Sequence, residues 1–173
     1  CGIDFYFSYS PERAIEGNII SDLKNIPQII SGYSDNCKSK AEKFWLNHCN
    51  SAILTESLEA AEIIKLTNNT YRDFTFAFSN LLGVMCSKYN INSANLIQAA
   101  NSGYSRSNLF SPSPGVGGYC LSKDPYMFVR DIKDKNLSES ILALRKLNEK
   151  MSLYPYRYIK YFSKKNHILA KKL

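Results

Sequence analysis

The chain has 173 residues, 45% of them hydrophobic and 13% aromatic, which is enough to bury a normal core in one domain or in parts of two. It carries 22 basic and 15 acidic residues, a net charge of +7, and no apolar run approaches the eighteen or so residues of a transmembrane helix. The five cysteines lie far apart without a CxxC pair, which argues against a disulfide framework or a zinc site and favours a reducing cytoplasm.

The first residue, Cys1, is not methionine and lies a few positions before a strand-like run, which indicates a piece of a longer protein. Residues 5–10, 27–32 and 51–55 read as short strands ended by turn residues. Between the last two, Ser34 or Asp35 can cap a helix over 37–49. Strand, helix and strand within about thirty residues are typical of a parallel α/β sheet.

The loop "SPERAIEGN" follows the first predicted strand directly and places Glu12 and Glu16 beyond its C-terminal end. Ligands bind at that edge in open α/β sheets. The two carboxylates could therefore be a base and a ribose or substrate contact. The alternative is a pair of solvated loop acids.

Residues 57–89 contain no proline, and their one glycine, Gly83, comes late. Their apolar side chains recur at helical spacing and predict one helix of about thirty residues, roughly 45 Å long; they are Ile64, Tyr71, Phe74, Phe78, Leu81 and Met85. Such a helix is too long for one small domain to cover, so we expect it to span domains or to pack against a second subunit.

The same helix would carry Glu62, Lys65 and Asn69 on one face, with Lys65 and Asn69 one turn apart. An ammonium beside an amide could stabilise an oxyanion. An ordinary polar face is the alternative.

Further helices are predicted at 93–101, from Asp124 with Pro125 at the first helical position, and from Asn136 with Glu139 placed for a capping box. The residues "SLYP" (152–155) indicate a break before the last segment.

That last segment holds six basic residues and no acidic one, so the rest of the chain is close to neutral; the six are Arg157, Lys160, Lys164, Lys165, Lys171 and Lys172. Cations alternate with aromatics in "YPYRYIKYF", which allows a nucleic-acid surface as one interpretation. A helix with a solvated basic face is the other.

Cys120 ends the glycine-rich stretch "SPSPGVGGYC". A thiol attacks as its thiolate, which a cation or a helix N-terminus favours, and a helix beginning at Asp124 would supply such a terminus. Glycines allow the backbone to approach a ligand closely. A buried cysteine behind a tight turn is the alternative, and the residues alone leave both open.

No G-x-G-x-x-G, P-loop or G-x-S-x-G motif is present. Four blocks in order nevertheless resemble the NAD-dependent nucleotide-sugar dehydrogenases: "SPERAIEGN", "AEIIKLTNNTYRD", "GYSRSNLFSPSPGVGGYCLSKDPY" and "ALRKLNEKM". The wording "SPER", "NTYRD" and "PGVGG" is most similar to the UDP-N-acetylhexosamine branch. The resemblance covers nearly the whole chain.

This resemblance implies an NAD-dependent, two-step oxidation of the C6 alcohol of a UDP-sugar through a cysteine thiohemiacetal and thioester. Cys120 matches the nucleophile, while Lys65, Asn69 and Asp124 match the cluster that steadies the oxyanion and prepares the water. Glu12 matches the acid/base carboxylate. The implied substrate contacts are Glu16, Arg106, Ser111, Pro112, Ser113, Pro114, Gly115, Val116 and Gly117, with Arg106 reaching the partner subunit's site. Glu16 and Lys123 lie on the cofactor side, and no metal is implied.

Two departures concern the substrate and the thiol. Tyr119 stands where the acetylhexosamine branch usually has histidine, so activation of the thiol would depend on Lys65 and the helix terminus. "SKD" resembles the "PKD" of the UDP-glucose and GDP-mannose branches. The sugar therefore stays open.

The family also implies parts that this chain lacks, namely the glycine-fingerprint half of the NAD domain and the C-terminal UDP-binding domain. We expect a mostly α-helical chain with residues 1–56 as the last α/β unit of the NAD domain, 57–152 as the central dimerisation and catalytic domain, and 153–173 as a linker and the start of the UDP-binding domain. We expect a homodimer through the long helix, no nucleic-acid or membrane partner, and no activity of this chain alone. A catalytically inactive dimerisation module and a nucleic-acid binder using 153–173 are the rival interpretations.

Overall fold

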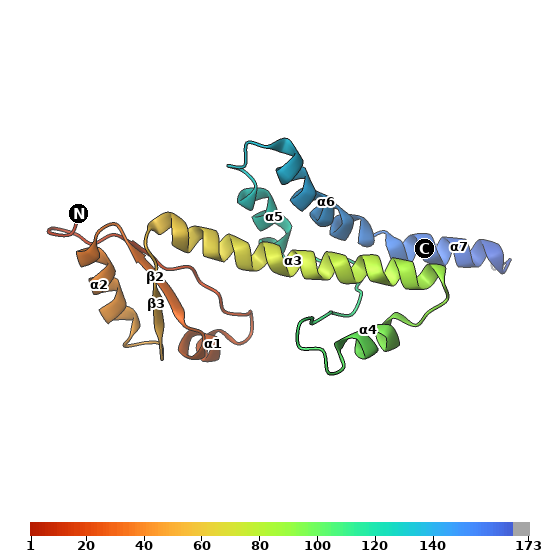
Figure 1. Ribbon diagram of the computed structural model, residues 1–173, viewed down its shortest axis with the longest axis horizontal. Helices are drawn as coiled ribbons and strands as arrows, with labels where there is room; N and C mark the ends of the chain where they lie inside the picture. The colour runs from red at the N-terminus through yellow and green to blue at the C-terminus, as the bar shows by residue number, and fades with distance from the viewer. Residues whose placement is uncertain (168–173) are drawn as a thin grey trace. The chain divides into compact units, whose positions relative to one another are not determined.

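The computed structural model describes residues 1–167 and is mostly helical, as predicted (Figure 1). It forms two compact units, one of residues 1–68 and one beginning at Asn69, and the division falls inside a single long helix. Each unit is described by itself below. Lys171, Lys172 and the predicted start of a UDP-binding domain after His167 lie outside the described residues.

The first unit is a small sheet with one helix packed against it. Its elements are β1 (Ser8–Tyr9), α1 (Ile19–Asn25), β2 (Gln28–Gly32), α2 (Asp35–Trp45) and β3 (Ala52–Leu54). Strand β2 lies in the centre, is buried throughout, and pairs parallel with β3 in a register that sets Ile29 opposite Ile53. The predicted parallel strand–helix–strand unit is therefore confirmed.

Local chemistry explains where α2 begins. The hydroxyl of Ser34 accepts the Cys37 backbone N–H at 3.3 Å, which caps the helix. Gly32 ends β2 so close to the first turn of α2 that a Cβ there would lie 2.3 Å from the Lys38 nitrogen. Only glycine allows this approach.

The prediction that Glu12 and Glu16 lie at the edge formed by the C-terminal ends of the parallel strands is wrong. Strand β1 is only two residues long and pairs antiparallel with β2, with Tyr9 opposite Ser31. Its C-terminal end therefore lies where β2 begins, and the Gln28 side chain donates to the Ser10 hydroxyl there at 2.8 Å. Helix α1 follows the predicted loop directly, was not predicted, and has no buried residue.

The second unit is built from helices along α3 (Leu58–Lys88), whose 31 residues confirm the predicted long helix. The others are α4 (Ser93–Asn101), α5 (Tyr119–Phe128), α6 (Lys135–Met151) and α7 (Tyr154–Lys165). The expected helix at 93–101 and the break near 152–155 are confirmed. Helix α5 packs against α6, and α6 against α7.

Two predicted helix starts are wrong. Helix α5 begins at Tyr119, after Gly118 with a φ of +86°, so Asp124 and Pro125 lie inside the helix. Pro125 is tolerated there because the carbonyl that it cannot bond, that of Leu121, accepts a hydrogen bond from Arg145 instead. Helix α6 is capped by Asp134 and not by Asn136.

The exposed and buried faces of α3 reverse the usual distribution of polarity. Several residues of the apolar stripe are exposed on this chain, namely Tyr71, Phe78, Leu81 and Met85. The buried positions from Asn69 onward are polar or small: Asn69, Thr70, Asp73, Ala77, Ser79, Asn80 and Cys86. The interior of the second unit is therefore organised by hydrogen bonds as much as by apolar contacts.

The corrected cap of α6 can be tested by mutation. The Asp134 carboxylate accepts the backbone N–H of Asn136 at 2.8 Å, so Asp134→Ala should lower the free energy of unfolding by about 1 kcal/mol. Asn136→Ala should change it by less than about 0.5 kcal/mol. Urea unfolding followed by circular dichroism measures both; a larger loss for Asn136→Ala would contradict the assigned cap.

Candidate active site

Cys120 is exposed in the first turn of α5, which excludes the buried structural cysteine considered from the sequence. Gly118, in a left-handed conformation, turns the chain into the helix, and the Ser122 hydroxyl donates to its carbonyl at 2.8 Å. A sulfur in the first turn lies among backbone N–H groups that have no partner within the helix. Backbone N–H groups at a helix N-terminus interact favourably with anions.

Asp124 lies one turn after Cys120 and is held on both carboxylate oxygens. The Asn69 amide donates to Oδ2 at 2.6 Å, and the Lys123 ammonium lies 2.5 Å from Oδ1. The Asp124 side chain is only 2% exposed. The structure thus brings together three predicted site residues, Asn69, Lys123 and Asp124, beside the helix turn that carries the thiol.

The charge of Lys123 is stabilised by these neighbours. Its hydrogen bond to Asp124 raises the pKa of Lys123 above its ordinary value, and the charges of Asp124, Cys120 and Tyr119 act in the same direction. The ammonium also lies over the Tyr119 ring, 5.3 Å from its centroid. Lys123 is therefore a cation paired with Asp124 in the N-terminal half of α5.

A second group of predicted residues lies in the first unit. The Lys65 ammonium donates to the backbone carbonyl of Glu12, and the Glu12 carboxylate accepts the Ala14 N–H. Glu16 is exposed in the same loop. Lys65 and Glu12 are therefore neighbours, while Asn69, four positions after Lys65 on α3, belongs to the second unit.

The predicted substrate loop, 111–117, is held by side chains along most of its length. The Ser113 N–H donates to the Asn80 side chain at 2.7 Å, and the Val116 carbonyl accepts from Arg145 at 2.9 Å. Pro112 packs so closely on α3 that a Cβ at Gly83 would lie 2.8 Å from the proline ring. The single glycine of the long helix therefore makes room for this loop.

Arg106 is exposed, and its guanidinium lies over the Tyr104 ring, 4.8 Å from the centroid. Ser111, Pro114 and Gly117 are exposed or half-buried within the loop.

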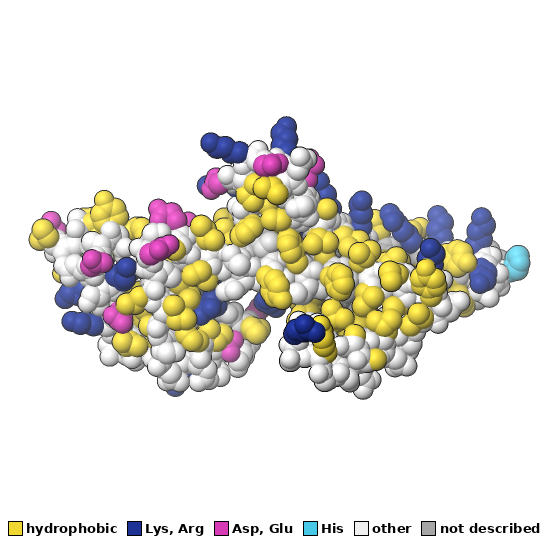
Figure 2. Space-filling view, in the orientation of Figure 1, with side chains coloured by type: hydrophobic (Ala, Val, Ile, Leu, Met, Phe, Trp, Pro, Cys, Tyr) yellow, Lys and Arg dark blue, Asp and Glu magenta, His cyan; other side chains and the backbone are white. Residues whose placement is uncertain are grey.

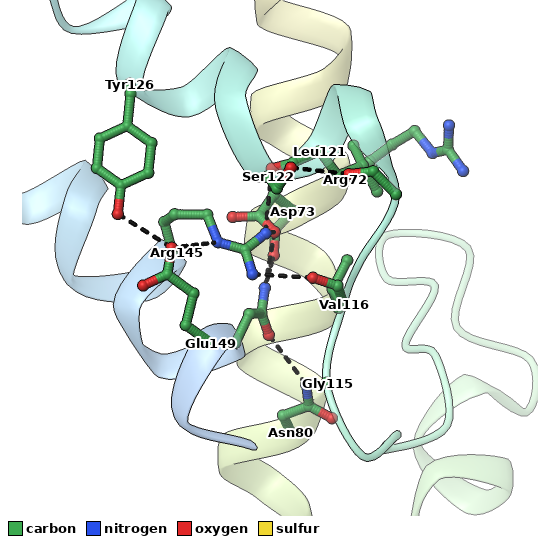
Figure 3. A network of polar contacts seen from close by, with 12 residues as sticks. Arg72, Asp73, Asn80, Gly115, Val116, Leu121, Ser122, Tyr126, Arg145 and Glu149 are labelled. Atoms are coloured by element: carbon green, nitrogen blue, oxygen red, sulfur yellow. Dashed lines mark hydrogen bonds and ion pairs between the residues drawn. The ribbon is translucent and has the colours of Figure 1, made fainter. Parts of the chain in front are cut away.

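A buried polar network behind the loop was missed from the sequence (Figure 3). Arg145 of α6 donates to Asp73 of α3 at 2.6 Å, and the Asn148 amide donates to the same carboxylate oxygen at 2.8 Å. Asn80 donates to the Asn148 side chain at 2.9 Å. Burial raises the pKa of Asp73, and the hydrogen bond from Asn148 and the charge of Arg145 oppose that rise. Polar residues at helical spacing inside apolar segments, Asp73 with Asn80 and Arg145 with Asn148, were the available signal.

A dinucleotide requires a glycine-rich turn that leaves room for its pyrophosphate at a helix N-terminus. The β2–α2 turn does not fit, because Ser34 caps α2 and Gly32 packs against its first turn. Within residues 1–167, no group of three or more His, Cys, Asp or Glu side chains is arranged so that it could hold a metal ion. No described helix combines the length and apolarity needed to cross a membrane.

Comparison with known proteins identifies relatives of this arrangement. The family model for the central domain of the UDP-glucose/GDP-mannose dehydrogenase family matches residues 59–150. The chain is 33% identical over 153 residues to a UDP-N-acetyl-D-mannosamine dehydrogenase of Pyrococcus horikoshii, covering 88% of this chain and 36% of the relative. It is 34% identical over 149 residues to a Methanococcus maripaludis protein of the same name, covering 86% of this chain and 34% of the relative.

The solved structure of the UDP-D-ManNAc dehydrogenase from Pyrococcus horikoshii superposes with a TM-score of 0.88 at 32% identity, over 96% of this chain and 39% of that one. The chain thus spans little more than a third of the length of the relatives that it matches. Because the family model covers more than half of the chain, the sequence resemblance is confirmed. The chain belongs to the UDP-glucose/GDP-mannose dehydrogenase family of nucleotide-sugar dehydrogenases.

Proposed function

We propose that the complete protein is an NAD-dependent nucleotide-sugar 6-dehydrogenase that oxidises the C6 alcohol of a UDP-sugar to the acid in two steps, for polysaccharide precursor synthesis in the cytoplasm. One observation carries the proposal. In a chain of this family, an exposed cysteine, Cys120, lies one helical turn before a buried carboxylate, Asp124, that an amide and an ammonium hold on both oxygens.

The thiol accounts for the four-electron outcome. The Cys120 sulfur adds to the C6 aldehyde carbon and gives a thiohemiacetal, which becomes a thioester when it loses a hydride from carbon and a proton from oxygen. Water then adds to the thioester carbonyl, the C–S bond breaks, and the thiolate and the acid separate. A bound NAD would supply the hydride acceptor for both oxidations, and by the resemblance Glu16 and Lys123 would lie on its side of the site.

The residues around Asp124 suit the steps in which charge develops on oxygen. An asparagine amide has two N–H donors, so Asn69 can hold Asp124 with one and stabilise an oxyanion with the other. Asp124 can orient the attacking water, and the Lys123 ammonium lies 2.5 Å from its Oδ1. Lys65 as a further oxyanion partner, Glu12 as acid/base and Glu16 and Lys123 as cofactor-side residues stay predictions from the resemblance.

For the substrate, we propose a UDP-N-acetylhexosamine. The similarity to proteins named UDP-N-acetyl-D-mannosamine dehydrogenase supports this class.

Tyr119, in place of the usual histidine, is 82% exposed beside Cys120. Thiol activation in this protein therefore involves charges and backbone N–H groups rather than an imidazole at that position.

We also propose that two copies of the protein pair through α3. Tyr71, Phe78 and Met85 are each more than half exposed along this helix, and apolar side chains gather over its C-terminal half in Figure 2. Exposed apolar area of this kind marks an interaction surface. The assignment of 1–56 to the NAD domain, 57–152 to the dimerisation domain and 153–173 to a linker remains part of this proposal.

Replacing the nucleophile should stop the reaction between the two oxidations. In the complete enzyme, Cys120→Ser should reduce the rate of acid formation about a thousandfold or more. A serine hydroxyl is a weak nucleophile toward the aldehyde and cannot form the thioester, while the fold should be kept. Chromatography of the UDP-sugar products measures this, with Cys86→Ser in α3 as the control. Acid formation at the normal rate by Cys120→Ser would remove this residue from its role.

Thiol labelling distinguishes an active enzyme from an inactive dimerisation module. Cys120 is exposed beside the Lys123 cation, so near neutral pH it should react with iodoacetamide about tenfold faster than glutathione does. Cys37, Cys49 and Cys86 are buried and should react more slowly than Cys120. Mass spectrometry of the peptides measures these rates. An inactive module predicts a rate no faster than glutathione, and a fast phase that persists in Cys120→Ser would assign it to another thiol.

The proposed pairing surface can be broken by one charge. Phe78→Asp should weaken dimerisation about thirtyfold or more, because it buries a carboxylate in an apolar contact. Sedimentation equilibrium measures the dissociation constant. Phe44→Asp, on α2 and similarly exposed at 58%, is the matched control. A dimer that tolerates Phe78→Asp but not Phe44→Asp would place the interface elsewhere.

A further inference from the structure

Arg145 joins three separate segments of the second unit. Its side chain is 1% exposed, yet it carries a charge. One nitrogen, Nη1, donates to Asp73 of α3 at 2.6 Å and to the Leu121 carbonyl of α5 at 3.1 Å. The other, Nη2, donates to the Val116 carbonyl at 2.9 Å. The guanidinium therefore contacts the backbone on both sides of the Gly117–Gly118 turn that leads to Cys120 (Figure 3).

The contact with Leu121 exists because of Pro125. In a regular helix, the Leu121 carbonyl would accept the backbone N–H of residue 125, but proline has none. Arg145 bonds this carbonyl from outside the helix. Leu121 directly follows Cys120, so the guanidinium holds the carbonyl of the residue next to the one that carries the thiol.

The loop has few other restraints near the thiol. A Cβ placed on Gly117 or Gly118 would meet no atom within 4 Å, so no neighbouring segment crowds these positions from the side-chain direction, and the Gly118 carbonyl is bonded only locally, by Ser122. Glycine by itself is conformationally permissive. Earlier in the loop, Ser113 is held by Asn80, which is bonded through Asn148 to the same Asp73 carboxylate. One connected network thus fixes the loop at Ser113, Val116 and Leu121.

Stability is a weak reason for such a buried charge. A buried ion pair is often no more stabilising than apolar side chains of similar volume. This pair also leaves Asp73 Oδ2 and Arg145 Nε buried without a hydrogen-bond partner among the described residues, although Nε lies 3.5 Å from the Glu149 carboxylate. What the guanidinium provides, and an apolar side chain cannot, is several donors in a fixed planar geometry.

We propose that Arg145, anchored by Asp73, is a positioning residue for Cys120: by holding the Val116 and Leu121 carbonyls it fixes the glycine turn and the first turn of α5 in the orientation that presents the thiol. Its effect on catalysis rests on the proposed function. Its effect on the order of the turn does not.

The test uses the complete enzyme and the variant Arg145→Lys. Lysine keeps the charge but cannot bond two carbonyls and a carboxylate in one plane. We expect kcat to fall about a hundredfold, with KM for the UDP-sugar changed less than about threefold, because a misplaced nucleophile affects the chemical step. We also expect the amides of residues 116–122 to exchange with deuterium at least about tenfold faster. Arg130→Lys, at an arginine whose side chain is 78% exposed, is the matched control and should change neither quantity.

A second variant separates an effect on the position of the thiol from an effect on the stability of the protein. Asp73→Leu/Arg145→Met replaces the pair by apolar side chains and should regain the unfolding midpoint of the unaltered enzyme, or exceed it. We expect its kcat to stay low and its 116–122 amides to stay fast in exchange. Wild-type kcat and exchange in this double variant, or in Arg145→Lys, would overturn the proposal, as would a change in KM alone.

Failure of the proposed function would look different. If the unaltered protein does not oxidise UDP-sugars, or if Cys120→Ser keeps full acid production, the catalytic assignment fails. Deuterium exchange of residues 116–122 then decides the positioning role alone: faster exchange in Arg145→Lys but not in Arg130→Lys supports it, and equal exchange in the two variants overturns it.

Discussion

The second unit depends on the charge-assisted hydrogen bond between the Arg145 guanidinium and the Asp73 carboxylate, both of which are almost completely buried. Around it, side-chain amides and backbone carbonyls satisfy most of the remaining donors and acceptors. Such a network has strict geometric demands, because each buried polar group without a partner costs free energy. Helices that meet through it can therefore adopt few alternative arrangements, which is what a site built from several segments requires.

The long helix α3 explains why buried polar contacts fix the arrangement of the helices in the second unit. Its buried face carries Asp73, Ser79 and Asn80, while aromatic residues such as Tyr71 and Phe78 are exposed. A helix in a single small domain would place these side chains the other way round. The arrangement is reasonable if the polar face organises the catalytic loop within one chain and the apolar face belongs to an interface between copies. Both sides of α3 are then used.

Periodicity in the sequence predicted α3, α4 and the parallel β2–α2–β3 unit, since these depend on apolar spacing and local caps such as Ser34. The start of α5 was predicted too late, because Asp124–Pro125 has the local signature of a helix beginning. Asp124 is instead buried between Asn69 and Lys123, and the carbonyl left free by Pro125 is bonded by Arg145. The direction of β1 was likewise missed, since two residues carry no information about their pairing partner.

The amino-acid sequence by itself determined the family and the residues that could carry the chemistry, because both follow from the order of the motifs. It also determined the mostly helical class, which follows from the periodicity of the apolar residues. Only the tertiary structure decided that Cys120 is exposed and that Asp124 is hydrogen-bonded by Asn69 and Lys123. It also decided that Arg145 holds the loop that leads to Cys120. The physical reason is that exposure and hydrogen-bond partnership also depend on residues far apart along the chain, such as Asn69 and Asp124, which are 55 positions apart, and Asp73 and Asn148, which are 75 apart. Local sequence patterns do not record such distant pairings.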